Sequence, residues 1–85
     1  MKLFYKVSPQ EYKNCMSKIR DKFSMHEEVD EADTILLPDN ESQIERVTGI
    51  FDPSSDDMAQ VRVVLVDESL REFFDSILGE PYLVK

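Results

Sequence analysis

The first residues of the chain alternate between polar and apolar side chains. Residues 2–8 place one set of apolar side chains on a single face of an extended segment, namely Leu3, Tyr5 and Val7. This period of two predicts a half-buried strand. Phe4 points the other way, between Lys2 and Lys6. We therefore expect Phe4, with Val64 or Val66, on a sheet face that the helices leave open.

A helical spacing follows this strand. Ser8, Pro9 and Glu11 combine an N-cap residue, a proline suited to the first helical position and the glutamate of a capping box, so a helix should begin at Pro9. The next apolar residues recur at a 3.6-residue period and predict one buried helix face: Tyr12, Cys15, Met16, Ile19 and Phe23.

The periodicity is lost over residues 24–33. From His26 onward, eight residues contain five acids and no lysine or arginine, which predicts a solvated connection or a frayed extension of the helix. Residues 34–37 form a short apolar run that ends at a Pro-Asp-Asn turn, and they predict a brief strand.

Two further strands and a helix complete the pattern. Residues 43–51 and 60–66 predict an antiparallel hairpin around a loop rich in turn formers, and the apolar character of 61–66 favours the interior of the sheet. A second helix should start near Ser69 and Glu72, which have capping-box spacing, and end at Gly79. Its apolar stripe is Leu70, Phe73, Phe74, Ile77 and Leu78.

These elements predict one α+β domain over residues 1–85. The expected order is β-α-β-β-β-α, to which residues 82–84 can add a final strand, in a mostly antiparallel sheet with both helices packed on one face. The 41% apolar content fits a globular domain, and no apolar run is long enough to cross a bilayer. The N-terminus lacks the features of a secretory signal, so we expect a cytoplasmic protein.

Catalytic signatures are weak in this chain. Cys15 falls within the apolar helix stripe, where a free cysteine is usually a small buried hydrophobe. His26 is the only histidine and does not belong to a zinc-binding motif. Gly49 and Gly79 are isolated, so they form no phosphate-binding loop; we interpret Gly49 as a bulge or close contact and Gly79 as a helix cap. The sequence therefore favours a non-enzymatic protein without a cofactor.

Carboxylates are suited to calcium or magnesium, and two acidic segments of this chain offer them. Asp52, Asp56 and Asp57 lie in one turn-rich segment, and residues 30–33 carry three more acids. Neither segment fits the twelve-residue EF-hand pattern. Divalent-cation binding at the first of these segments stays an open alternative.

Charge is the most informative property of the sequence. The net charge is −8, and the first 22 residues hold six bases and two acids, whereas the remainder holds four bases and sixteen acids. This balance argues against direct nucleic-acid binding, because phosphate contacts need a basic surface. A solvated surface that keeps a small protein soluble is one interpretation.

The functional interpretation is a carboxylate-rich surface that docks on a basic protein. Such a module is typical of inhibitors and antagonists, including phage anti-host proteins, DNA mimics, antitoxins and immunity proteins. Two sets of residues are the candidates: first Glu27, Glu28, Asp30, Glu31 and Asp33, and second Glu68, Glu72 and Asp75. The alternative is a structural or assembly subunit that forms a homodimer through an open sheet face or through the terminal strand.

Overall fold

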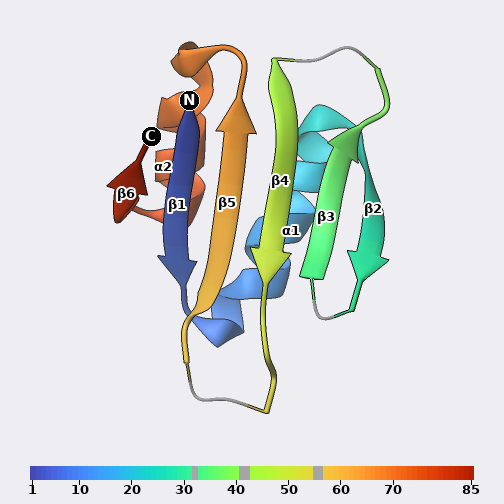
Figure 1. The fold of residues 1–85 in the computed structure, drawn as a ribbon, viewed down its shortest axis with the longest axis vertical. Coiled ribbons are helices and arrows are strands. Elements are labelled where there is room, and N and C mark those ends of the chain that lie inside the picture. The colour runs from blue at the N-terminus through green and yellow to red at the C-terminus, as the bar shows by residue number, and fades with distance from the viewer. Residues whose placement is uncertain (32, 41–42, 55–56) are drawn as a thin grey trace.

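Two layers make up the fold: an antiparallel sheet, and two helices that lie behind it in the view of Figure 1. The computed structural model describes residues 1–31, 33–40, 43–54 and 57–85. Its strands are β1 (Lys2–Val7), β2 (Met25–Asp30), β3 (Asp33–Pro38), β4 (Ile44–Ile50), β5 (Ala59–Leu65) and β6 (Leu83–Val84). Its helices are α1 (Pro9–Phe23) and α2 (Arg71–Leu78), and the short 3₁₀ helix η1 (Glu68–Leu70) leads into α2.

The strands follow the order β2-β3-β4-β5-β1-β6, and every neighbouring pair is antiparallel. The predicted hairpin of β4 and β5 is confirmed, and β5 lies in the sheet interior as its apolar sequence indicates. Residues 83–84 add the final strand beside β1. The fold class is therefore α+β, with both helices on one face, as predicted.

The core lies between the sheet and the helices. Alternate residues of the long strands point toward the helices and are buried, and the predicted stripe of α1 supplies the opposing side chains. The fully buried members with the largest side chains are Tyr5, Phe74, Leu3, Ile19, Leu36, Ile44, Val47, Val61 and Val63. Within the described part of the chain, neither helix has the length and apolar content needed to cross a bilayer.

Residues 25–30 form a strand, so the expectation of a loop or helix extension over residues 24–33 is wrong. Ser24 has the left-handed conformation (φ 50°), which ends α1 and turns the chain back into the sheet. Only Met25 of β2 is buried, and this strand therefore lacks the apolar alternation by which strands are recognised. Backbone pairing along β3, from Met25 opposite Pro38 to Asp30 opposite Asp33, holds β2 in place.

The helices begin close to the predicted positions, but the groups that cap their N-termini differ from those predicted. The α1 helix begins at Pro9, yet the Ser8 side chain makes no capping hydrogen bond; its carbonyl oxygen accepts from the Glu11 and Tyr12 N–H groups. The capping box expected at Ser69 and Glu72 is also not formed. Instead the Asp67 carboxylate accepts from the Ser69 N–H at 2.9 Å, and this bond lowers the Asp67 pKa.

Gly49 allows helix α1 to approach the sheet closely. A Cβ at this position would collide with the Tyr12 hydroxyl and would lie 2.9 Å from both Met16 Cε and Tyr12 Cε1. Phe51 stacks on the Tyr12 ring, with centroids 5.0 Å apart. Of the two predicted roles for Gly49, the structure supports close contact.

We predict that Gly49→Ala lowers the free energy of unfolding by about 2 kcal/mol, because overpacking a filled core forces side chains or backbone to shift. Urea denaturation followed by circular dichroism measures this change. Adding Tyr12→Phe should recover part of the loss, because it removes the closest atom. Equal losses in the single and double variants would contradict this packing effect.

Candidate functional site

The hairpin of β2 and β3 gathers the first set of predicted acids at one edge of the sheet. Residues directly opposite in the pairing share a face, so Glu28, Asp30 and Asp33 lie on the face that the helices leave open. Glu27 lies on the helix-facing side, and Glu31 occupies the turn with φ 55°. We name these five residues the acidic hairpin.

The carboxylates of the acidic hairpin are uncompensated. All except Asp33, which is half-buried, are exposed. Among the described residues, no lysine or arginine nitrogen lies within 4.0 Å of any of their oxygens. Of the described residues, only His26 lies at ion-pair distance from one of these carboxylates: its Nε2 is 3.6 Å from Glu28, while its Nδ1 is 2.7 Å from Asp39 outside the hairpin. The hairpin therefore presents a concentrated negative charge to solvent.

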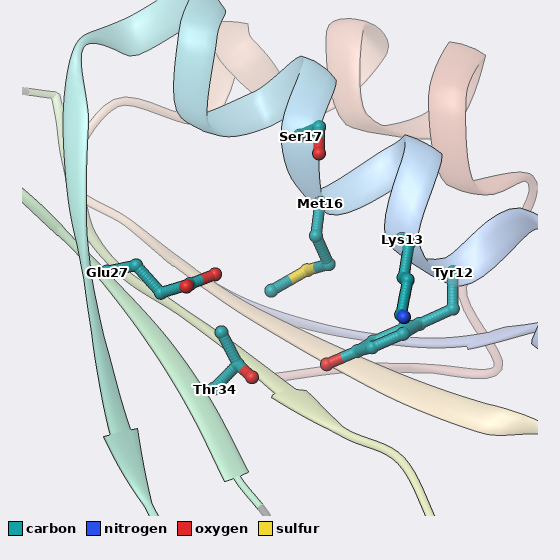
Figure 2. A pocket seen from close by; sticks show the side chains of 6 residues that line it. All are labelled: Tyr12, Lys13, Met16, Ser17, Glu27 and Thr34. Carbon is teal, nitrogen blue, oxygen red and sulfur yellow. The ribbon is translucent and has the colours of Figure 1, made fainter. Parts of the chain in front are cut away.

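A groove of about 250 Å³ separates the hairpin from helix α1 (Figure 2). Its lining residues are Tyr12, Lys13, Met16, Ser17, Glu27 and Thr34. The Tyr12 hydroxyl points toward Thr34 at the base of this groove. The hydroxyl is buried, and burial raises the pKa of Tyr12. Val29, on the same side of β2, is 70% exposed, so the helix layer does not cover the sheet edge.

The second set of predicted acids lies elsewhere in the molecule. Glu68 belongs to η1, while Glu72 and Asp75 belong to α2, which packs behind β1 at the other side of the sheet (Figure 1). The structure therefore does not bring the two sets together. Strands β2 and β1 are four strand spacings apart, which is about 19 Å.

Asp75 has a structural role in this arrangement. It accepts a hydrogen bond of 2.7 Å from the Tyr5 hydroxyl, and its other oxygen lies 3.4 Å from Arg71 Nε. Burial and the Asp75 carboxylate both raise the pKa of Tyr5, so the phenol stays a proton donor. Asp75 thus fastens α2 to β1, whereas Glu68 and Glu72 are exposed.

The described residues that were considered for catalysis or metal binding make local structural contacts. Cys15 is buried, its thiol donates to the Ile77 carbonyl at 3.6 Å, and burial raises its pKa. Asp52 accepts from the Ser54 N–H and hydroxyl at 2.9 and 2.6 Å, which lowers its pKa. Asp56 lies outside the described residues. Within the described ranges, no three His, Cys, Asp or Glu side chains are grouped to hold a metal ion.

A cationic surface was missed in the sequence. Lys2, Lys6 and Arg62 alternate with apolar residues along β1 and β5, and the pairing of these strands places them on the open face. Arg46 joins them from β4, opposite Val64. The alternation was visible in the chain, but only the strand pairing shows that these cations are neighbours.

Comparison with known protein families, curated proteins and solved structures finds no match to this chain. The geometry and charge of the described residues therefore carry the functional argument.

We predict that Asp75→Ala lowers the free energy of unfolding by about 2 kcal/mol, because it leaves the buried end of Tyr5 without its acceptor. Glu72→Ala, on the exposed side of the same helix, should change it by less than about 0.5 kcal/mol. Thermal and urea unfolding of the two variants measure the difference. Indistinguishable stabilities would show that Asp75 is only a surface charge.

Proposed function

We propose that this chain is a non-enzymatic binding module that docks the acidic hairpin on a basic segment of a protein partner. The observation that carries this proposal is the local charge: the five carboxylates have no lysine or arginine within 4.0 Å among the described residues. A basic partner would supply the missing countercharge. Complementary charge of this kind accelerates encounter and excludes anionic competitors.

The position of the hairpin supports strand addition as the mode of contact. The β2 strand pairs with β3 on one side, and none of the described strands lies on its other side, so part of its backbone donors and acceptors faces outward. An extended partner segment can pair with such an edge. Lysine or arginine side chains of that segment would then lie beside Glu28 and Asp30 on one face and beside Glu27 on the other.

The same charges favour a foreign partner over a second β2 strand. Direct pairing of two β2 edges would bring several carboxylates together, and opposed like charges destabilise a strand pair. A basic strand paired with β2 would instead place lysine or arginine side chains opposite these carboxylates, and opposite charges stabilise a strand pair. The acidic hairpin thus protects the edge against its own copies while leaving it open to a cationic chain.

Within this proposal, the module acts as an inhibitor or antagonist that occupies a basic surface needed by another ligand. A phage anti-host protein, DNA mimic, antitoxin or immunity protein would act in this way. Competition of this type requires affinity and position only, so it needs no catalytic residue in the module.

We predict that the triple variant E28K/D30K/D33K loses the basic partner proteins that the wild-type chain captures from a lysate of its native cells. The matched control is E68K/E72K/E80K, which makes the same charge change at exposed acids outside the hairpin. Quantitative mass spectrometry of the captured proteins provides the measurement. The control should retain the partners, and captured binding should weaken as salt rises.

Equal recovery of the same partners by both triple variants would overturn the assignment of the site. Loss of the partners in both would mean that net charge, and not the hairpin, determines binding. Circular dichroism of each variant confirms that the fold is retained before capture.

A further inference from the structure

The open face of the sheet carries half of the basic residues of this acidic chain. Five of its ten lysines and arginines lie there, on β1, β4, β5 and the C-terminal residue: Lys2, Lys6, Arg46, Arg62 and Lys85. Lys85 is placed on this face by its Nζ, which is 5.9 Å from the centre of the Phe4 ring. We name these residues the cationic half of the open face.

These cations surround an aromatic and hollowed surface. The Arg62 guanidinium lies 5.7 Å from the Phe4 ring centre, and Lys6 Nζ lies 5.0 Å from that of Tyr82. A hollow of about 150 Å³ is lined by Lys2, Arg46, Arg62 and neighbouring apolar residues. Among the described residues, none of the five cations is within 4.0 Å of a carboxylate. Mutually repelling charges gathered in this way are suited to an external anionic surface.

The opposite half of the same face provides that anionic surface. Glu28 and Asp30 lie there on β2, about 19 Å from β1 across the sheet, and Asp33 lies on β3, about 14 Å from β1. Half-buried apolar side chains lie among the charges of both halves: Phe4, Ile50 and Val64 in the cationic half, and Ile35 and Leu37 in the anionic half. One face thus contains a cationic half over β1, β5 and β4 and an anionic half over β3 and β2, with half-buried apolar side chains in both.

We propose that a second copy of this chain packs on the open face as a two-fold symmetric dimer. A two-fold axis that lies in the interface and runs along the strands exchanges the two halves, so each anionic half meets the partner's cationic half. An axis running across the strands would place like charges together. Charge complementarity therefore selects one orientation, with β2 over the β1 and β3 over the β5 of the other copy. The axis then follows β4, so Arg46 lies beside its own counterpart and adds no complementary contact.

The size of the face is consistent with a reversible dimer. Six strands spaced at about 4.8 Å, each about six residues long at roughly 3.3 Å per residue, cover on the order of 500 Å² per copy. Two copies would bury on the order of 1,000 Å², which is the lower bound for a specific interface. The strands of the two sheets should cross at about 30°, as in aligned sheet packing.

This dimer would use three carboxylates of the acidic hairpin, so it would compete with a basic partner for them. That competition rests on the proposed function, whereas the dimer itself does not. The cationic half of one copy would take the place of the basic partner on the other. The dimer would then be an inactive form of the module, and a cationic ligand that binds the acidic hairpin more tightly would convert it to the monomer.

Reciprocal charge reversal tests the proposal on the purified chain. The first variant, K6E/R46E/R62E, reverses the cationic half, and the second, E28K/D30K/D33K, reverses the anionic half. We expect each variant to sediment as a monomer, because like charges face each other in its dimer. An equal mixture of the two should sediment as a dimer, because both contacts of the mixed pair are again complementary. This recovery also shows that both variants are folded.

Salt dependence of the wild-type chain gives a second measurement. Sedimentation at about 50 and 500 mM salt should show a dimer that weakens at least about tenfold at the higher concentration, because salt screens the exposed ion pairs. A dimer that strengthens with salt would overturn the proposal. Salt would then be screening the repulsion between two negatively charged copies that apolar contact holds together, and not the attraction between the anionic and cationic halves. A wild-type monomer, or a mixture that stays monomeric, would also overturn it.

Two controls distinguish the dimer from an oligonucleotide-binding surface and from the proposed function. A monomeric wild-type chain that binds a fluorescent single-stranded oligonucleotide, and loses it in K6E/R46E/R62E, would assign the cationic half to nucleic acid and reject the dimer. The same variant keeps the acidic hairpin, so it should still capture basic partner proteins. Failure of the dimer and failure of the proposed function are therefore observed in different experiments.

Discussion

One-sided burial is the constraint on which this structure depends. Two helices, of fifteen and eight residues, supply apolar side chains to one face of a six-stranded sheet. The close approach of α1 at Gly49 brings Tyr12 and Met16 against the central strands. Everything that the helices do not cover must remain compatible with water. The open face and the β2 edge therefore became available for charge.

Charge is distributed on that exposed surface by strand and not by sequence segment. The division of the sequence at residue 22 suggested a basic N-terminal region and an acidic remainder. In the folded chain, Lys2 and Lys6 of the first region lie next to Arg46 and Arg62 of the second. The acids of residues 27–33 lie at the far edge of the same sheet. A chain with net charge −8 can thus contain a distinctly cationic surface.

The sequence predicted those elements whose side chains carry a periodic signal. The α1 stripe, the alternation in β1 and the apolar β5 are all recognisable because burial of one face requires them. The β2 strand was missed because Met25 is its only buried side chain, so backbone pairing alone defines it. The caps were misassigned because Asp67 and Ser69 both have suitable side chains, and their competition is settled by local geometry.

The candidate site was predictable in part for a related reason. The grouping of Glu27 to Asp33 follows from their proximity along the chain, and a hairpin preserves it. The distinction between Glu72 and Asp75 depends on Tyr5, seventy residues before Asp75 and bonded to it, which no local pattern reveals. The same limitation concealed the cationic half of the open face, whose members come from four separated segments.

The place of β1 in the sheet has a consequence for the order in which the chain is completed. Lys2 lies opposite Val64 in β5, and Leu3 lies opposite Val84 in β6. Strand β1 therefore pairs with segments that follow it by more than fifty residues, and its first neighbour, β5, exists only once residues 59–65 have been made. Helix α1 and the hairpin of β2 and β3 can form locally beforehand, but closure of the sheet around β1 has to follow the synthesis of β5 and β6.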